Sequence, residues 1–404
     1  MNARNPRFTL LDSLRAIAAL SVFGYHVVFH TRSLGSTFGP WLRHLNVGVP
    51  IFFLISGFLL YRPWARARFR GEPGPSVRRY AARRALRIVP AYWLALPLVA
   101  LWLGRDYVFS PGGIVTYFGF LQAYRHGTII GGIGQAWTLS VEMSFYIALP
   151  LLALTVRRVA VRSSRGFLVS ELALCGLLFA FAVTWQLEAV RHLGNDNGLF
   201  FPALVSLPGA LDLFALGMVL AVVSVWVEGT GARPLVVRVV DRASWLPWVG
   251  AAAAYVALVY SAEWFGGALG RQVLLTHELG GLVAFGLLLP AVFGDERRGV
   301  VRRLLGTPVL RWVGRVSYAF YLWHLVVILK LQEYGVRDAL GRWLFAGVCL
   351  AVSLAIAAAS WYWIERRFLD LGRRRPPART ADDAAVEPDA PPPASVAVPA
   401  EAGR

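Results

Sequence analysis

Long apolar stretches alternate with short basic segments along almost the whole chain of 404 residues. A helix that crosses a membrane needs about 20 apolar residues, and ten stretches reach or approach that length. These predicted spans are 8–29, 47–61, 86–104, 135–156, 167–187, 200–227, 244–260, 272–294, 312–331 and 343–364. A further apolar piece at 112–123 is too short to span, and we expect it to pack at the interface or to re-enter. The pattern predicts an all-α, polytopic integral membrane protein with about ten transmembrane helices.

The composition agrees with a membrane protein and excludes several other classes. Hydrophobic residues make up 57% of the chain and charged residues 16%, which is more apolar than the surface of a soluble fold of this size allows. The net charge of +18 lies mostly between the apolar stretches, so we expect contact with membrane lipid and no nucleic-acid partner. The two cysteines, Cys175 and Cys349, each lie in an apolar run. This excludes a disulfide framework and a cysteine-rich metal site.

Basic residues alternate in number between successive connecting segments. The segments 1–7, 62–87, 157–166, 228–243, 295–311 and 365–404 hold 30 Arg and Lys residues, whereas the intervening segments hold 8. By the positive-inside rule, both termini lie in the cytoplasm, and we expect a multi-pass protein of the inner or plasma membrane. The first span is expected to be a retained helix and not a signal peptide.

The chain is expected to divide into a membrane domain and a tail. Residues 1–368 hold all of the predicted spans. Residues 369–404 are rich in Pro and Ala and lack hydrophobic periodicity, so they are predicted to form a disordered cytoplasmic tail.

The first span holds ionisable residues, which cost several kcal/mol inside a membrane unless they are paired or hydrated. Arg15 and His26 are eleven residues apart, so they lie nearly on one helix face but about 16 Å apart along the axis. We expect them to share a groove without touching. Arg15 suits a phosphate or thioester oxygen, and His26 suits proton transfer near neutral pH. Alternatively, Arg15 only pairs with Asp12 and His26 is a packing residue.

Two histidines at helical spacing raise the question of a metal. His26 and His30 are four residues apart, but no carboxylate joins them in an HExxH pattern, and aromatic residues surround them. We therefore predict no metal site.

The second and third spans carry two further features. Ser56 and Gly57 form a small surface that predicts close approach by another helix. Arg83, Arg84 and Arg87 fall within one and a half turns at the start of the third span, where backbone N–H groups add positive potential. A polyphosphate such as the nucleotide end of coenzyme A would fit there. Membrane topology and lipid headgroups are the alternative explanation for these arginines.

Two later spans carry polar residues in apolar surroundings. Glu142 is a carboxylate in the fourth span, and we expect His26 or an arginine as its partner; a structural ion pair is the alternative. Ser317, Tyr321 and His324 are spaced by four and three residues in the ninth span. They form a polar stripe on one helix face, which is unusual for a helix that faces only lipid. Packing is again the alternative.

Five stretches, in order, resemble the membrane acyltransferase 3 family, the integral membrane O-acyltransferases that modify bacterial surface sugars, nodulation factors and antibiotic glycosides. They are LDSLRAIAALSVFGYH, VPIFFLISGFLL, RRALRIVPAYW, WTLSVEMSFY and SYAFYLWH. The first holds an Arg-x10-His motif formed by Arg15 and His26. The resemblance runs through residues 8–368. Ser13 and Ala16 depart from the pattern, since glycines are common there.

The resemblance implies an acyltransferase that transfers groups other than amino-acyl groups. Acyl-CoA would be the donor substrate, approached from the cytoplasm, with no bound cofactor, and a hydroxyl at or beyond the outer face would be the acceptor. His26, Arg15 and Glu142 would be catalytic. We expect substrate-binding roles for Arg83, Arg84, Arg87, Ser317, Tyr321 and His324.

The predicted function is transfer of a short acyl group from acyl-CoA to a hydroxyl of a cell-envelope carbohydrate, with His26 as general base. Three alternatives stay open. One is acylation of a macrolide-type antibiotic sugar. The second is a transporter or flippase without acyl transfer, and the third is a non-catalytic protein whose basic loops bind anionic lipid.

Overall fold

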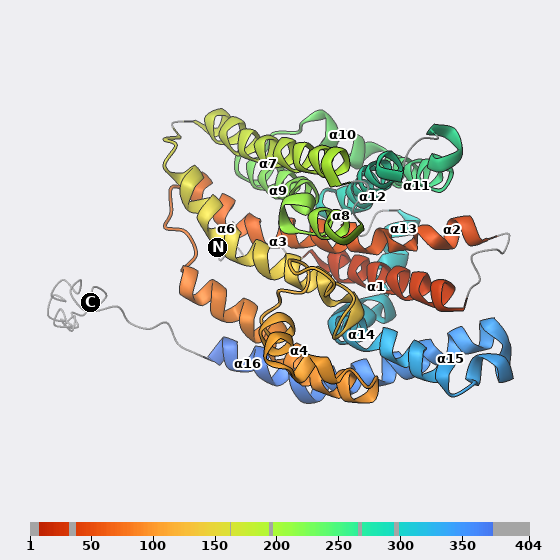
Figure 1. Ribbon diagram of the computed structural model, residues 1–404. Coiled ribbons are helices and arrows are strands. Elements are labelled where there is room, and N and C mark those ends of the chain that lie inside the picture. The colour runs from red at the N-terminus through yellow and green to blue at the C-terminus, as the bar shows by residue number, and fades with distance from the viewer. Residues whose placement is uncertain are drawn as a thin grey trace, which may run out of the picture.

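The chain is a bundle of long helices in the computed structural model (Figure 1), which describes residues 8–31, 38–161, 163–193, 197–265, 269–294 and 299–374. The α-helices are α1 (Thr9–His30), α2 (Gly39–Arg43), α3 (Gly48–Phe69), α4 (Val77–Trp102), α5 (Pro111–Gly113), α6 (Trp137–Arg157), α7 (Ser164–Leu193), α8 (Asn197–Leu204), α9 (Leu207–Thr230), α10 (Leu235–Arg242), α11 (Trp245–Phe265), α12 (Leu269–Val292), α13 (Val300–Leu305), α14 (Pro308–Glu333), α15 (Val336–Ser360) and α16 (Arg366–Arg374). Short 3-10 or π turns are η2 (His44–Val47), η3 (Asp106–Phe109), η4 (Ile114–Phe118), η5 (Gly134–Ala136) and η6 (Trp361–Glu365). No strand occurs within the described ranges, so the predicted all-α fold is confirmed.

Nine helical stretches in the described part of the chain are long and apolar enough to cross a membrane. A tenth is formed by α10 and α11 if this pair, bent by 100°, counts as one span. The α11 helix covers the predicted span 244–260. The protein is therefore a multi-pass membrane protein with the predicted number of spans.

The second span is longer than predicted. The apolar stretch 47–61 lies in α3, which continues to Phe69. Three arginines in the added turns have carboxylate partners on neighbouring helices: Arg62 and Arg66 pair with Glu228, and Arg68 pairs with Glu171. These partners offset the cost of the charges, so the helix can extend beyond its apolar part.

The last helix overlaps the predicted tail. Helix α16 ends at Arg374 and so includes residues 369–374 of the segment predicted to be disordered. Residues 375–404, the rest of the predicted tail, lie outside the described residues.

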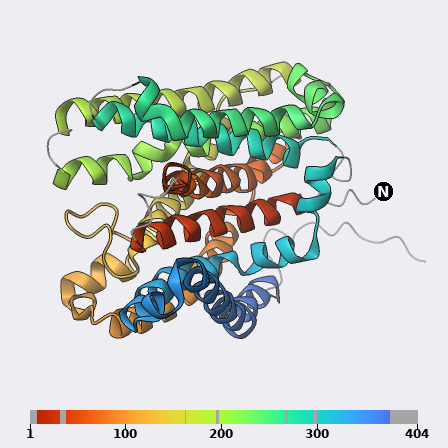
Figure 2. The same cartoon turned by 90° about the vertical axis from the view of Figure 1, so that its right-hand side faces the viewer.

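The helices form three tiers, of which the middle one is a central pair of helices (Figures 1 and 2). Helices α1 and α3 lie in the middle, and α7, α9, α11 and α12 form the tier on one side. The tier on the other side holds α4, α14, α15 and α16. The most extensive packing joins α3 to α9, and the packing of α1 on α14 and of α7 on α9 comes next. The central pair therefore connects both outer tiers.

Glycines allow α3 and α9 to pack backbone to backbone. A Cβ atom on Gly57 would lie 2.3 Å from the carbonyl oxygen of Phe214, and one on Gly217 would lie 2.2 Å from that of Leu54. Only hydrogen fits at these two positions. The predicted close helix approach at Ser56 and Gly57 is confirmed, because small residues let helix backbones meet in the absence of a hydrophobic driving force between them.

A buried polar pair joins two helices of the α7, α9, α11 and α12 tier. The imidazole of His277 on α12 is 2.6 Å from the carboxylate of Asp212 on α9, which is fully buried. Gln186 on α7 donates a hydrogen bond to the carbonyl oxygen of Gly209. Sequence analysis did not identify this pair, since its members lie far apart in separate spans.

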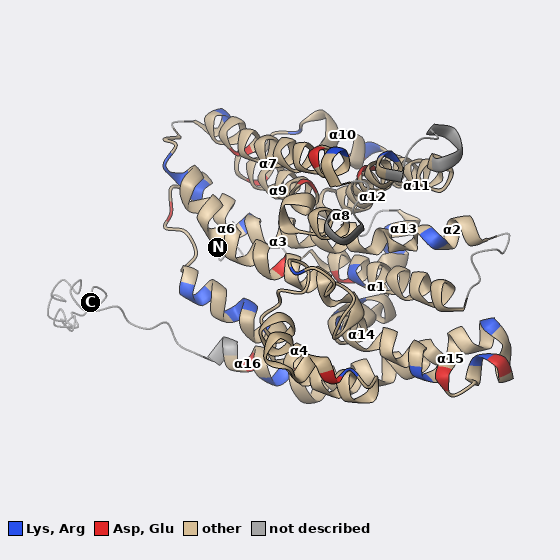
Figure 3. Ribbon diagram, viewed as in Figure 1, with Lys and Arg blue, Asp and Glu red and all other residues tan. Residues whose placement is uncertain are grey.

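The connecting segments with the most arginines meet at one end of the bundle, named here the basic end. Arg157 donates to the carbonyl oxygen of Glu72, and Arg68 donates to that of Val159. The guanidinium of Arg62 lies 4.9 Å from the ring of Phe8, just before α1. Figure 3 shows that most charged residues lie toward the ends of the helices. The arginine-rich segments 62–87 and 157–166 thus lie at the same end of the structure.

The segment predicted to be too short to span lies at the opposite end. Residues 112–123 form short turns that pack on α4, where Tyr92 and Trp93 donate hydrogen bonds to the carbonyl oxygens of Tyr117 and Phe118. The segment is not among the described helices that are long and apolar enough to span, as predicted.

We predict that Gly57→Ala destabilises the protein, because the added methyl group must push α3 away from α9. Overpacking of this kind costs about 1–3 kcal/mol, and the thermal unfolding midpoint in detergent should fall. Gly176→Ala is the matched control, since a Cβ there meets nothing within 4 Å. Equal midpoints for the two variants would contradict the tight contact.

Candidate active site

A pocket opens among five helices that are distant in sequence: α1, α3, α4, α6 and α14. It encloses about 760 Å³, counting its open mouth. Its polar lining residues are Arg15, Ser56, Arg84, Arg87, Thr138, Glu142, Tyr146, Ser317, Tyr318 and Tyr321. Apolar side chains such as Val49, Phe52 and Leu139 form the rest of the wall. The structure therefore brings together six of the nine residues that the sequence singled out.

Positive charge gathers on one wall of this pocket. Arg15 lies near enough to Arg84 and Arg87 to interact with them electrostatically, and it forms an ion pair with Asp12 at 3.2 Å. Arg84 lies over the ring of Tyr146, 5.9 Å from its centre. Its Nε atom is buried and has no hydrogen-bond partner in the described part of the chain. An anionic ligand would satisfy this cluster.

Glu142 is held by two hydroxyl groups. The Oγ of Ser56 and the phenol of Tyr146 each donate to Oε1 of Glu142 at 2.6 Å. Of the two expected partners, His26 is paired with His324 instead, and Arg15 lies near enough to interact with Glu142 electrostatically. The two hydroxyl groups therefore satisfy Oε1 of Glu142 within the pocket wall.

A second pocket continues from the first toward the basic end. It encloses about 620 Å³, and Leu59, Leu60 and Arg84 belong to both linings. Arg79 and Arg83 line only the second pocket, beside the first turn of α4. Arginines therefore line both pockets, from the start of α4 to Arg15.

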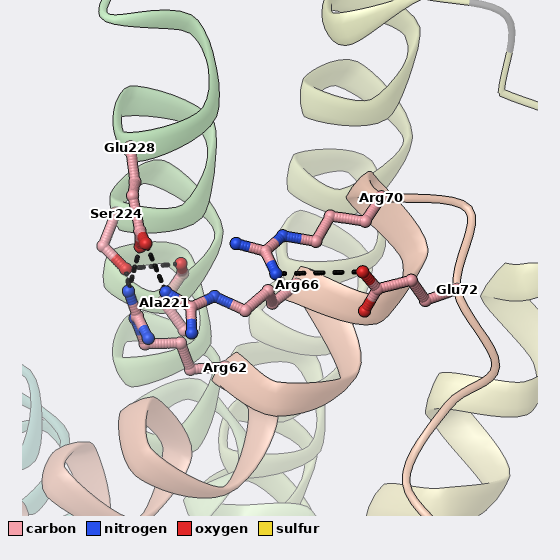
Figure 4. A network of polar contacts seen from close by, with 7 residues as sticks. All are labelled: Arg62, Arg66, Arg70, Glu72, Ala221, Ser224 and Glu228. Atoms are coloured by element: carbon pink, nitrogen blue, oxygen red, sulfur yellow. Dashed lines mark hydrogen bonds and ion pairs between the residues drawn. The ribbon is translucent and has the colours of Figure 1, made fainter. Parts of the chain in front are cut away.

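The arginines of α3 and α4 differ in their partners. In Figure 4, Arg62 and Arg66 both bind Glu228, and Arg70 lies 3.8 Å from Glu72. Arg62 also donates to Ser224 at 3.1 Å. In contrast, Arg83, Arg84 and Arg87 form no ion pair with any described carboxylate. The α4 arginines remain available to a ligand.

His26 does not line either pocket. Its Nδ1 atom is 2.9 Å from Nε2 of His324 on α14, so two residues that the sequence assigned separately form one pair. Tyr321, one turn before His324, lines the first pocket, and its ring centre is 5.8 Å from that of His324. Tyr321 thus lies between the pocket and the histidine pair.

The polar stripe on α14 is divided between these two places. Ser317 and Tyr321 face the pocket, whereas His324 is fully buried against His26. Tyr321 donates to the carbonyl oxygen of Gln135 at 2.8 Å and lies 2.7 Å from the hydroxyl of Thr138. These bonds fix the ring at the end of the pocket.

Sequence analysis missed several lining residues. Tyr146 follows Glu142 by one helical turn, and that spacing could have identified it. Ser56 was considered only as a small residue. Thr138 and Tyr318 gave no signal in the sequence, because their role depends on which helices adjoin them.

No metal cluster accompanies the histidines. Across the part of the chain that the structure describes, no three His, Cys, Asp or Glu side chains lie in a position to hold a metal ion. The rings of His26 and His30 are 6.5 Å apart.

Comparisons with known proteins agree on one family. Residues 8–362 match the Acyl_transf_3 model, described as an acyltransferase domain. "Acyltransferase MdmB" of Streptomyces mycarofaciens is 29% identical over 419 residues, which cover 96% of this chain and 98% of the relative. "Nodulation protein 10" of Rhizobium leguminosarum bv. viciae is 27% identical, covering 89% and 93%. "Putative O-acetyltransferase SACOL0978" of Staphylococcus aureus (strain COL) is 23% identical, covering 89% and 56%.

No solved structure matches the chain. The family match nevertheless covers most of the sequence, including every helix that contributes to the arginine-lined pocket and both members of the histidine pair. The chain is an O-acyltransferase that transfers groups other than amino-acyl groups, and it belongs to the Acyl_transf_3 family.

Proposed function

We propose that this acyltransferase takes a short acyl group from acyl-CoA and transfers it to a hydroxyl of a cell-envelope carbohydrate. The observation that carries the proposal is the pair of adjoining pockets, which share Leu59, Leu60 and Arg84 and are lined by arginines from Arg83 to Arg15. The unpaired guanidinium groups suit the phosphates of the nucleotide end of coenzyme A. The inner pocket is lined largely by apolar side chains, which suits the pantetheine arm, and it extends to Tyr321.

In the proposed reaction, each polar group has one role. Nε2 of His26 accepts the proton of the acceptor hydroxyl, whose oxygen attacks the thioester carbonyl carbon. Arg15 lies about three helical turns from His26 on α1 and so binds an anionic part of the donor away from the reacting carbonyl. The carbon–sulfur bond then breaks, the ester forms, and coenzyme A leaves as the thiolate, which takes up a proton. Glu142 offsets the charge of the arginines and keeps them oriented.

The acceptor approaches from the side of the histidine pair. The pocket ends at Thr138 and Tyr321, and the histidines lie beyond Tyr321, toward the end opposite the basic end. The acyl group and the acceptor hydroxyl would meet at Tyr321. This arrangement supports an acceptor outside the cytoplasm, such as an envelope carbohydrate.

We predict that His26→Ala abolishes release of free coenzyme A from short acyl-CoA donors by the purified protein in detergent. Loss of a general base typically costs about 10²–10⁴-fold in rate. His192→Ala is the control, because the His192 side chain is 75% exposed on α7, and it should leave the rate unchanged. Envelope glycan is supplied as acceptor. If wild-type protein releases no thiol from any donor, acyl-CoA is not the substrate.

We predict that Arg84→Gln raises the KM for acetyl-CoA about tenfold or more, because one charge-assisted hydrogen bond to phosphate contributes about 1.5–3 kcal/mol. The KM for acetyl-pantetheine, which lacks the nucleotide and its phosphates, should not change. Arg70→Gln is the control of equal charge, since Arg70 lies outside both pockets. An equal loss for both donors would argue against phosphate binding by Arg84.

We propose that the basic end faces the cytoplasm, so that both chain termini lie there. Cysteines introduced at Arg78 and Ile130 test this with a thiol reagent that does not cross membranes; both positions are exposed. In intact cells the reagent should label Ile130→Cys at once and Arg78→Cys only after permeabilisation. The native Cys175 and Cys349 are buried, so labelling of the wild-type protein gives the background signal. The reverse labelling pattern would invert the topology.

A further inference from the structure

The hydrogen bonds around the histidine pair determine where its protons lie. Nδ1 of His324 is 3.1 Å from the carbonyl oxygen of Phe320, one turn earlier on α14. A carbonyl oxygen can only accept, so this nitrogen of His324 carries a proton. In a neutral imidazole the other nitrogen, Nε2, then carries a lone pair and accepts.

The same reasoning extends to His26. Its Nδ1 lies 2.9 Å from that accepting Nε2 of His324, so Nδ1 of His26 is the donor. In neutral His26 the proton is therefore on Nδ1, and Nε2 has a free lone pair. No described residue forms a hydrogen bond with this Nε2 atom, and it is not among the fully buried polar atoms. It is open to a substrate.

His324 is a neutral acceptor for Nδ1 of His26, and the carbonyl oxygen of Val22, one turn earlier on α1, is a further acceptor for the His26 ring. Aromatic rings enclose the pair: those of Phe23, Phe320 and Tyr321 lie 6.4, 5.7 and 5.8 Å from the His324 ring. No described carboxylate forms a hydrogen bond or ion pair with either histidine. The orienting carboxylate of a Ser-His-Asp site has no counterpart here.

We infer that His324 is a positioning residue: it receives the Nδ1 proton of His26 and so fixes His26 in the form whose Nε2 can take a proton from the acceptor hydroxyl. When His26 accepts that proton, its ring becomes positively charged and still donates from Nδ1 to the neutral His324, which stabilises the cation. The inference rests on the proposed role of His26 and replaces the substrate-binding role expected for His324.

The kinetic test compares two substitutions at one position. His324→Gln keeps an amide oxygen that can accept from His26 and an amide N–H that can donate to Phe320. His324→Phe keeps a ring of similar volume but offers no acceptor. We expect kcat to fall at least about a hundredfold in His324→Phe. In His324→Gln, kcat should be at least about tenfold higher than in His324→Phe. The KM for acyl-CoA should stay within about twofold of wild type in both, because His324 does not line the donor pockets.

A spectroscopic test is independent of activity. The chain has seven histidines, so nitrogen-15 labelling of histidine gives few signals, and the His26 signals are those that vanish in His26→Gln. We expect the neutral His26 of wild type and of His324→Gln to carry its proton on Nδ1. In His324→Phe the proton should move to Nε2.

Three results would overturn the inference. They are a proton on Nε2 of His26 in wild type, a proton that stays on Nδ1 in His324→Phe, and equal kcat for the Phe and Gln variants. A wild-type protein that shows the expected proton position but transfers no acyl group from any donor would instead overturn the proposed function and leave the tautomer assignment intact.

Discussion

Burial of positive charge in an apolar environment is the constraint on which this structure depends. Taking an arginine out of water costs several kcal/mol unless a carboxylate, a hydrogen-bond acceptor or an anionic ligand replaces the water. On α3 the cost is met within the protein, since Arg62 and Arg66 bind Glu228 and Arg68 binds Glu171. These pairs also join α3 to α9 and α7. Where a neighbouring helix supplies a carboxylate, the resulting ion pair thus holds the two helices together.

On α4, in contrast, the arginines that face the pocket have no such carboxylate partners. Arg84 and Arg87 face a pocket in which the nearest carboxylate, Glu142, is already bound by Ser56 and Tyr146. Arg15 is paired with Asp12, whereas Arg84 and Arg87 form no ion pair with a described carboxylate. The Nε atom of Arg84 is buried and has no hydrogen-bond acceptor in the described part of the chain. An anionic donor substrate would complete the charge balance, which links binding of the donor to the stability of the helices around it.

The two substrates of the proposed reaction approach Tyr321 from opposite sides. Tyr321 is held by Gln135 and Thr138, and the histidine pair lies on its other side. Arginine-lined space on one side suits a polyanion, and a neutral, aromatic environment on the other suits proton transfer by an uncharged imidazole. A single helix, α14, contributes to both sides, so a shift of this helix would affect donor binding and base orientation together.

Much of the fold and many of the site residues could be predicted from the sequence. Apolar length gave the number of spans, and the alternation of arginines gave the segments that meet at the basic end, because both properties depend only on local composition and on the thickness of the membrane. Arg15, Glu142 and Ser317 stood out because charged and polar groups are costly in a span. Their presence in one pocket agrees with that expectation, although their functional roles remain predictions.

The tertiary structure decided what depends on which helices lie side by side. Glu142 is bound by Ser56 rather than by His26, and His26 is paired with His324, 298 residues away. The extension of α3 beyond residue 61 depends on carboxylates from α7 and α9. A sequence shows that a polar group in a membrane needs a partner, because burial without one is costly. It does not name the partner, because hydrogen bonds act over about 3 Å and so require the helices to be in place.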